Sequence, residues 1–414
     1  MMVTSSQGKR AATTTRTAIS LLVCARFLGL LADQMSTFML PVAMYTLTRD
    51  VTLSGIAFTV QWLPRVLAMP VLGVFVGRFP ALRQFVLTDT TRAAVLLIVA
   101  AFPEPGVLLA TSGLLTLLNG HAKITTESVF ANRVASDLLS DAQSKLQGAQ
   151  QLAMTTGPAL GGVLLATPGL SGGVVVVAAV FVLGATITPV LARGIVLDRR
   201  VDDEQPAGPL GQLRTGAVAT VRNRPLMQLM LLTILVNLIG GLALAGLPMI
   251  MVGNFGTDSS AVGLVAGAGS TASLATVVIV NPLTRRMEIG RIVAIAFALL
   301  AFSAPGMAWA PSEISFGIMY GIWSAGITVF TIWMRTRRLQ LITDTQVGTT
   351  LGFFIAAILV ATPISGGVLS AVGDRIDVQR LLLVVTCVVA GLIAPLAWAW
   401  WRGVRRPGDS VPHT

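Results

Sequence analysis

Eight ionisable side chains lie inside long apolar stretches of this sequence, where a charge needs a reason. Placing a charged side chain at the centre of an apolar membrane segment costs at least ~2.5–3.5 kcal/mol. There a carboxyl group can carry a proton, and a guanidinium or ammonium group can bind an anion. All eight belong to the first half of the chain, and Asn237 is the most polar candidate in the second half. The eight are Arg26, Asp33, Arg65, Asp89, Arg92, His121, Lys123 and Glu127.

Asp33 is the main candidate for proton coupling because it lies near the middle of the apolar stretch 19–47. Desolvation disfavours the charged form of a carboxyl group, so that such a group can bind and release a proton. Glu127 is the second proton-coupling candidate. A structural alternative stays open, in which Asp33 pairs with Arg26, two helical turns away on the same face, or with Arg65.

Arginine is suited to binding a carboxylate because its guanidinium is planar and always charged. Arg65 lies deep in the apolar stretch 54–76 and is therefore a candidate clamp for an anionic substrate, unless it only pairs with Asp33. Arg26 is a further substrate-binding candidate, but it lies closer to the end of its stretch and can also extend to the interface. Asp89 and Arg92, one turn apart, indicate a gate or a structural bridge.

A polar stripe marks the apolar stretch 106–130. Asn119, Lys123 and Glu127 recur every four residues and so share one helix face, which is expected to line a cavity because lipid would not tolerate it. Lys123 and Glu127 can also simply neutralise each other. His121 points elsewhere and is either a substrate contact or a hydrogen-bonded helix residue. Asn119, His121, Lys123 and Asn237 are the remaining substrate-binding candidates.

The elements that must position these residues are membrane-spanning helices. The chain has 414 residues, of which 54% are hydrophobic and only 11% are charged, against about 25% in soluble domains. We expect an all-α integral membrane protein, with the lipid bilayer as its partner and no nucleic acid despite a net charge of +11. Twelve spans are predicted near 19–47, 54–76, 84–102, 106–130, 146–167, 172–193, 226–251, 260–281, 290–309, 313–334, 347–372 and 378–401.

The basic residues predict the orientation of these spans. With twelve spans, 22 basic residues fall in connections on one side, and only Arg49, Arg375 and Arg380 fall on the other. The side richer in Lys and Arg is normally cytoplasmic. This predicts a bacterial inner-membrane protein whose termini are both cytoplasmic. The predicted parts are a tail at 1–18, a bundle at 19–193, a polar linker at 194–225, a second bundle at 226–401 and a tail at 402–414.

The two predicted bundles repeat one another in sequence. Leu40-Pro41 recurs as Leu247-Pro248, and Arg78 recurs as Arg285, both 207 residues later. A Gly-Gly pair follows a proline in each half, as Pro158…Gly161-Gly162 and as Pro363…Gly366-Gly367, 205 residues later. Two six-helix halves in parallel repeat place a substrate site between them near mid-membrane. Proline and small residues at these places predict bends and close helix packing.

Several segments of the chain resemble the major facilitator superfamily. The segment from Gly73 to Gly77-Arg78 is similar to the family's loop between helices two and three, although Gly77 replaces its usual acidic residue. Gly157-Pro158-x-x-Gly161-Gly162 looks like the end of a motif of proton-linked exporters. Further similarity is to the branch of the enterobactin exporter and macrolide efflux pumps. It rests on Ala32-Asp33-Gln34-Met35 before Leu40-Pro41, on Asp89-x-x-Arg92 and on Arg222-Asn223-Arg224-Pro225-Leu226.

This resemblance implies two pseudo-symmetric six-helix bundles that alternate between two open states, and proton-coupled export of a small solute. A mild excess of cationic side chains in the apolar stretches favours an anionic, carboxylate-rich substrate, with a siderophore as the first hypothesis. Macrolide-type drug efflux and uptake of a small organic anion are the alternatives. An enzyme is disfavoured because no catalytic, metal-binding or phosphate-binding motif is found, so no cofactor is expected. We expect a monomer.

Overall fold

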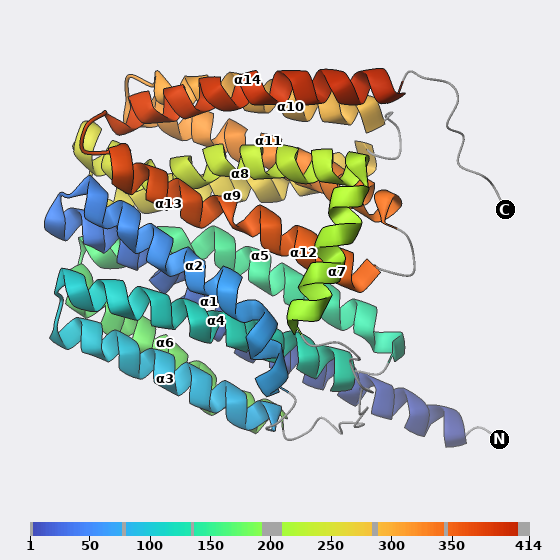
Figure 1. Cartoon of the computed structure of the whole chain (residues 1–414). Helices are drawn as coiled ribbons and strands as arrows, with labels where there is room; N and C mark the ends of the chain where they lie inside the picture. Colours follow the sequence, from blue (N-terminus) through green and yellow to red (C-terminus); the bar gives the residue numbers. More distant parts are fainter. Residues whose placement is uncertain are drawn as a thin grey trace. The chain divides into compact units, whose positions relative to one another are not determined.

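A computed structural model describes residues 3–76, 80–133, 136–192, 209–283, 289–342 and 347–404 (Figure 1). Gly77 and Arg78 lie outside these ranges, and the side chains of Arg65 and Glu127 are outside the described part as well. Every described regular element is a helix, so the predicted all-α class is confirmed. The helices are α1 (Val3–Thr48), α2 (Val51–Val76), α3 (Ala81–Ala101), α4 (Pro105–Arg133), α5 (Ser136–Ala166), α6 (Gly169–Ala192), α7 (Pro209–Arg222), α8 (Arg224–Pro248), α9 (Ser259–Leu283), α10 (Ile289–Ala308), α11 (Glu313–Leu341), α12 (Val347–Leu359), α13 (Ala361–Val372) and α14 (Val378–Val404), with a π-helical turn η1 at Met249–Asn254.

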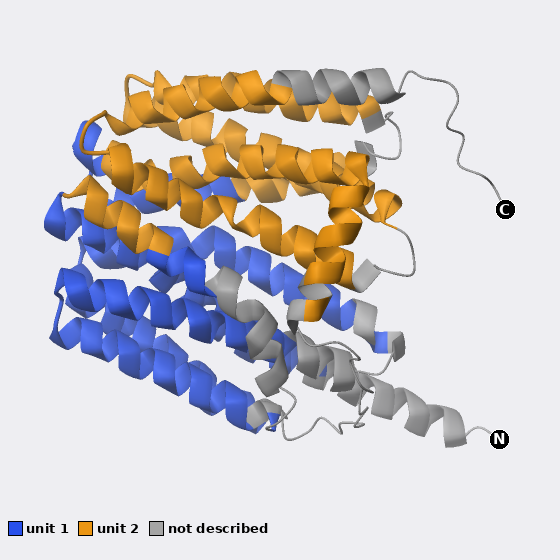
Figure 2. Cartoon of the chain, in the orientation of Figure 1, with its two compact units in different colours: residues 1–49, 60–205, 251–270 blue, residues 50–59, 206–250, 271–414 orange. Residues whose placement is uncertain are grey.

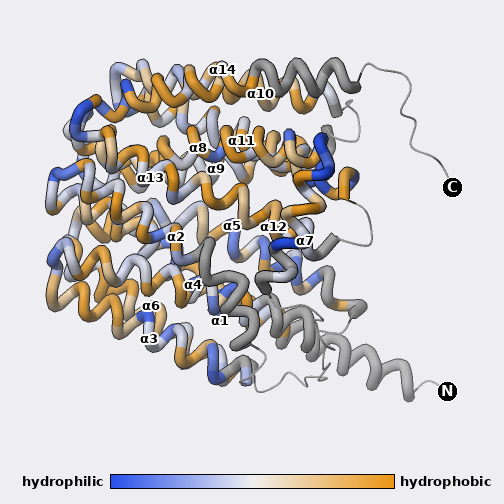
Figure 3. The backbone as a smooth tube through the Cα atoms, viewed as in Figure 1, coloured by the Kyte–Doolittle hydropathy of each residue, from blue (hydrophilic) through white to orange (hydrophobic). Residues whose placement is uncertain are grey.

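The helices are apolar on their outer faces as well as in their cores. Among the described residues, eight helices are long and apolar enough to cross a membrane. Large apolar side chains such as Leu87, Val278, Phe302 and Ile314 are exposed, as expected where lipid is the solvent. Figure 3 shows hydrophobic residues along the helices and hydrophilic residues gathered at their ends.

The described helices follow the twelve predicted spans with two additions. The span predicted at 347–372 is divided into α12 and α13, because Pro363 has no N–H to bond the carbonyl of Leu359 and the regular helix is interrupted there. The predicted linker 194–225 contains an additional helix, α7, where the sequence composition predicted only a polar connection.

The described helices form two compact units that do not coincide with the two sequence halves (Figure 2). Unit 1 comprises Met1–Arg49, Val60–Gln205 and Met251–Ser270, and unit 2 comprises the rest of the chain. The start of α2 therefore packs in unit 2 with second-half helices, and the start of α9 packs in unit 1 with first-half helices.

Unit 1 is built around α1, which packs against both α5 and α6, and around the pair α3 and α6. Ile19, Leu22 and Val23 of α1 are buried against Leu138 and Leu146 of α5. In unit 2, α10 packs on α11, with the rings of Phe297 and Phe330 in an edge-on contact at 5.8 Å. The α8 helix packs on α13 in the same unit.

The internal repeat extends to the backbone at the turns that follow α1 and η1. Arg49 (φ 54°) and Gly256 (φ 69°) both adopt the left-handed conformation and are 207 residues apart. Asp50 then caps α2 by accepting the N–H of Leu53 at 2.8 Å, and Asp258 caps α9 by accepting that of Ala261 at 3.0 Å. Glycine reaches positive φ without the steric penalty that arginine pays.

Candidate functional site

A buried three-residue ion cluster lies in unit 1 between α1 and α3. Asp89 accepts hydrogen bonds from Nη1 of Arg26 at 2.9 Å and from Nη1 of Arg92 at 3.0 Å. The side chains are 3% (Arg26), 0% (Asp89) and 2% (Arg92) exposed. Asp89 and Arg92 meet because residues three apart on a helix share a face. Arg26 does not extend to the interface but turns inward to the Asp89 carboxylate.

The cluster is held from two further helices. Nη2 of Arg92 donates to the carbonyl of Leu118 on α4 at 2.9 Å. The guanidinium of Arg92 also lies 5.2 Å from the ring centre of Phe181 on α6, and that of Arg26 lies 4.4 Å from the ring centre of Phe85 on α3. Such cation–π contacts strengthen when water is excluded. The cluster therefore connects α1, α3, α4 and α6 in one unit.

Asp33 belongs to the same electrostatic group, although the sequence suggested Arg26 or Arg65 as its partner. The carboxylates of Asp89 and Asp33 both act on the charge of Arg92, while Arg26 acts on it with the opposite sign. Asp89 pairs with both guanidinium groups, and Asp33 adds a second carboxylate whose charge acts on Arg92. Among the described residues, Nε of Arg26 and Nε of Arg92 have no hydrogen-bond partner.

Sequence reasoning missed three residues that shape this cluster. Gly29 lies one turn after Arg26, and a Cβ there would lie 3.4 Å from Nη2 of Arg26 and 3.5 Å from Oδ2 of Asp89. Both are ordinary van der Waals distances, so Gly29 packs directly beside the ion pair. Its position at i+3 from Arg26 was the available signal. Phe85 and Phe181 are ordinary apolar residues in sequence, and only the fold brings them to the arginines.

The polar stripe on α4 begins beside this cluster. His121 is close enough to Arg92 to experience its charge. The buried Oδ1 of Asn119 has no hydrogen-bond partner among the described residues. Lys123 is partly exposed, and Thr125 donates to Oε1 of Gln84 at 3.3 Å on α3. The structure thus brings His121 near Arg92. The side chains of Glu127 and Arg65 are outside the described part.

Asn237 lies on α8 in unit 2 and bonds to the backbone of the interrupted helix. Its Nδ2 donates to the carbonyl of Ile358 at 3.1 Å, two residues before the break at Val360. Ser365 of α13 donates in turn to the carbonyl of Leu238 at 3.0 Å. These two bonds satisfy polar backbone groups between α8 and the α12–α13 break.

The Gly-Pro segments make close helix crossings, as the small residues predict. A Cβ on Gly157 would lie 2.5 Å from Cβ of Gln34, and one on Gly161 would lie 3.2 Å from the carbonyl oxygen of Met35, both on α1. Gly162 instead meets α9, where a Cβ would lie 2.9 Å from Cα of Gly263. Pro158 lies inside α5.

In unit 2, Gly366 of α13 meets the start of α2. A Cβ there would lie 2.8 Å from the carbonyl oxygen of Gly55 and 2.9 Å from the backbone nitrogen of Thr59. The hydroxyl of Thr59 donates to the carbonyl of Pro363 at 3.1 Å. Gly367, by contrast, faces open space. Gly73 lies in α2, but its side of the helix is outside the described part, as are Gly77 and Arg78.

Comparison with known proteins identifies similar sequences and folds. Residues 22–338 match the profile of the "Major Facilitator Superfamily". No curated protein gives a significant sequence match. A bacterial homologue of the iron transporter ferroportin in an inward-facing state is similar in structure, with a TM-score of 0.69, 16% identity and coverage of 93% of this chain and 98% of that one.

Two further solved structures share the fold. The nucleoside transporter NupG gives a TM-score of 0.71 with 12% identity, covering 94% of this chain and 99% of that one. The POT family transporter PepTSo gives a TM-score of 0.69 with 11% identity, covering 94% and 98%. At such low identities, the likeness carries the fold and not the substrate.

Proposed function

Since the chain belongs to the major facilitator superfamily and is a membrane transporter rather than an enzyme, we propose that it is a proton-coupled secondary transporter of a small anionic solute. Export of a carboxylate-rich siderophore is the first candidate, because three segments resemble the exporter branch of the family. One chain is proposed to act alone.

The observation that carries the anionic substrate is the arginine-rich cluster of unit 1. Arg26 and Arg92 are buried and both pair with the carboxylate of Asp89. Each also keeps an Nε–H donor that has no hydrogen-bond partner among the described residues. A charge-assisted hydrogen bond to a carboxylate is worth about 1.5–3 kcal/mol. Arg65 and Lys123 are proposed to extend the cationic surface toward the solute.

Asp33 is proposed to couple the solute to protons through Arg92. The charge of the Asp33 carboxylate acts on Arg92. A solute carboxylate that takes this place beside Arg92 leaves Asp33 without its counter-charge in apolar surroundings. Binding a proton then removes the desolvation penalty of that carboxylate. Glu127 is the second group proposed to take part.

The sign of this linkage supports a second candidate function. When an anion displaces Asp33 and Asp33 takes up a proton, anion and proton bind together, and an inward proton gradient then drives uptake of a small organic anion. An anion that moves without a proton is instead driven outward by the membrane potential, since moving one negative charge outward is worth about 2.3 kcal/mol per 100 mV. Drug efflux differs again, because the basic amine of a macrolide competes with the proton for Asp33.

Proton movement on solute binding separates these functions. Purified protein is mixed in weakly buffered detergent solution with citrate, a carboxylate siderophore or a macrolide, and the pH is recorded. Proton uptake with the anions supports cotransport, proton release with the siderophore supports exchange, and release with the macrolide alone supports drug efflux. Asp33→Asn is expected to remove the signal while binding is retained; an undiminished signal would exclude Asp33 from coupling.

The cationic surface is tested by Arg65→Gln and Lys123→Gln. Each variant is expected to weaken binding of the anionic solute by about 10- to 100-fold, because ~1.4 kcal/mol corresponds to tenfold. Arg65→Lys keeps the charge but loses the planar fork, so an intermediate loss is expected. Thermal melts of the same variants give the control. A collapsed melt with normal binding by the folded fraction would make Arg65 structural only.

A further inference from the structure

The α7 helix has two faces of different character. Gly216 and Thr220, one turn apart, are buried, and a Cβ on Gly216 would lie 2.2 Å from the carbonyl oxygen of Thr349 on α12. This face is therefore docked closely on α12. The opposite face exposes Arg214, Val218 and Arg222, which recur every four residues and so form one row.

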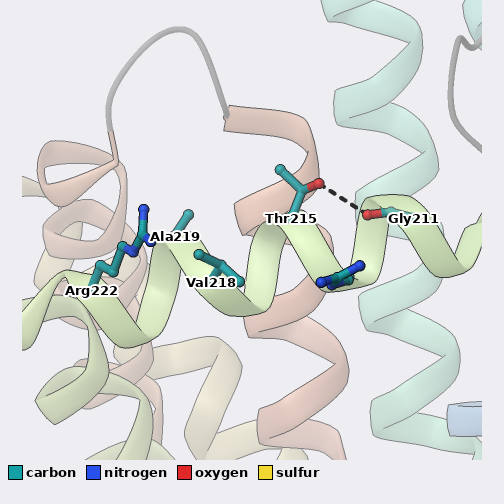
Figure 4. Close-up of a pocket in the computed structure, with 6 residues that line it drawn as sticks. Gly211, Thr215, Val218, Ala219 and Arg222 are labelled. Carbon is teal, nitrogen blue, oxygen red and sulfur yellow. Dashed lines mark hydrogen bonds between the residues drawn. The ribbon is translucent and has the colours of Figure 1, made fainter.

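This row lines a pocket of about 460 Å³. Figure 4 shows Arg222 at one end of the row and Gly211 at the other, with the hydroxyl of Thr215 donating to the carbonyl of Gly211 at 3.0 Å. Two of the six described lining residues are arginines, and none of the six is acidic. They are Gly211, Arg214, Thr215, Val218, Ala219 and Arg222. The lining of the pocket is thus electropositive.

The position of α7 places this pocket at the membrane surface. Asn223 alone separates α7 from α8, whose membrane-spanning stretch begins at Arg224. Asn223 fixes this corner, because its Oδ1 accepts the N–H of Leu226 at 3.1 Å and its Nδ2 donates to the carbonyl of Leu341 at 2.8 Å. Figure 1 shows α7 running across the direction of α8 and α12. It therefore lies along the bilayer surface.

We propose that the Arg214–Arg222 face of α7 binds the phosphate headgroup of an anionic phospholipid from the adjacent leaflet. The charges are complementary, because basic side chains at a membrane surface attract anionic lipids at about 1 kcal/mol each. The exposed side chains of Val218 (43%) and Val221 (58%) beside the arginines give the acyl chains an apolar contact. A free phosphate uses the arginines alone and gains nothing from the valines.

The test compares lipid binding to three double variants of the full chain in detergent, by native mass spectrometry. Phosphatidylglycerol is the probe and phosphatidylcholine the neutral reference. Arg214→Gln/Arg222→Gln is expected to weaken phosphatidylglycerol binding by about 30-fold, or about 5-fold per arginine. Arg214→Lys/Arg222→Lys keeps the charge and is expected to retain most of the affinity. Arg291→Gln/Arg335→Gln removes two other exposed charges of unit 2 and is the matched control.

Val218→Ser and a soluble competitor complete the experiment. Val218→Ser is expected to weaken the binding of phosphatidylglycerol but to leave the binding of inorganic phosphate unchanged. The proposal fails if the matched control loses as much affinity as the α7 variant, or if the α7 variant binds phosphatidylglycerol normally. It also fails if inorganic phosphate displaces the lipid at equal concentration, which would make the pocket a site for free anions.

Discussion

At the scale of single residues, the buried Asp89 links α1 to α3 in unit 1. One carboxylate with no exposed surface accepts hydrogen bonds from two guanidinium groups on two helices. Replacing one partner of a buried ion pair leaves an uncompensated charge and costs about 3–5 kcal/mol, far more than an exposed pair contributes. The cluster therefore stabilises the helix packing as well as supplying charge.

We predict that Asp89→Asn strongly lowers the melting temperature, with a loss of about 3–5 kcal/mol, because Arg26 and Arg92 both lose the carboxylate with which they pair. Adding Arg26→Gln to Asp89→Asn is expected to recover part of this loss, since the second change removes one of the stranded charges. Thermal melts of the two single variants and the double variant measure the coupling. Strictly additive losses would show that Arg26 and Asp89 do not stabilise each other. Lys145, which pairs with Asp141 where both are exposed, gives a matched control whose loss is expected below ~1 kcal/mol.

The backbone conformation of Arg49 leads to a second prediction at the scale of single residues. It is the one described residue other than glycine with positive φ, and the repeated position in the second half is Gly256. A left-handed backbone costs a residue with a Cβ roughly 1–2 kcal/mol. The guanidinium of Arg49 offsets part of this through the carbonyl of Val252 at 3.5 Å and the ring of Tyr45 at 5.9 Å.

We therefore expect Arg49→Ala to be less stable than Arg49→Gly by about 1 kcal/mol. Both variants lose the side-chain contacts of Arg49, but only the glycine variant is free of the steric strain of a positive φ. Melting temperatures of the two variants, compared in the same detergent, measure the difference. An Arg49→Ala protein as stable as Arg49→Gly would contradict the left-handed conformation at this turn.

At the scale of helices, adjacent glycines in α13 have opposite surroundings. Gly366 is in close contact with the backbone of α2 at Gly55 and Thr59, whereas Gly367 faces open space. Gly366→Ala forces the two helices apart and is expected to destabilise the protein by about 1–3 kcal/mol. Gly367→Ala is expected to be neutral or slightly stabilising, because alanine favours helix by up to ~1 kcal/mol over glycine. Equal melting temperatures for the two variants would contradict the close contact between α2 and α13 at Gly366.

The helices themselves were largely predictable from sequence, because long apolar runs have no other stable form in lipid. The small residues of Gly157-Pro158-x-x-Gly161-Gly162 also indicated close crossings. Two features were not predictable in this way. The α7 helix is short and amphipathic, with both arginines and valines on its exposed face, so composition alone resembles a loop. The break between α12 and α13 lies beside Pro363 and next to the carbonyl that Asn237 bonds, and an apolar run does not show where such a break falls.

The charge cluster was only partly predictable. Asp89 and Arg92 could be paired from their spacing on one helix, which fixes which side chains share a face. The pairing of Arg26 with Asp89 could not, because it depends on which helices pack together, and sequence spacing carries no information about partners 63 residues apart. The same limit applies to the roles of Arg65 and Glu127, which stay predictions.

At the scale of the whole molecule, orientation in the membrane follows from charge rather than from packing. The predicted connections hold 22 basic residues on one side and three on the other, and a shift by a single span would mix these two groups. The two left-handed turns at Arg49 and Gly256 occur at equivalent places in the repeat, which supports an equal number of spans in each half. We therefore propose that both termini and the 194–225 linker are cytoplasmic in a bacterial inner membrane.

Reporter fusions test this orientation. Fusions at Val201 and after Arg406 are expected to report the cytoplasm. A fusion near Thr257 is expected to report the periplasm, because α8 and η1 separate that turn from the linker. Asp374 lies between α13 and α14, so a fusion there serves as an internal control that must agree with Thr257. Cytoplasmic signal at Thr257 or Asp374, or periplasmic signal at Val201, would contradict the twelve-span topology. A periplasmic signal at Val201 would also move α7 and its Arg214–Arg222 face to the opposite leaflet.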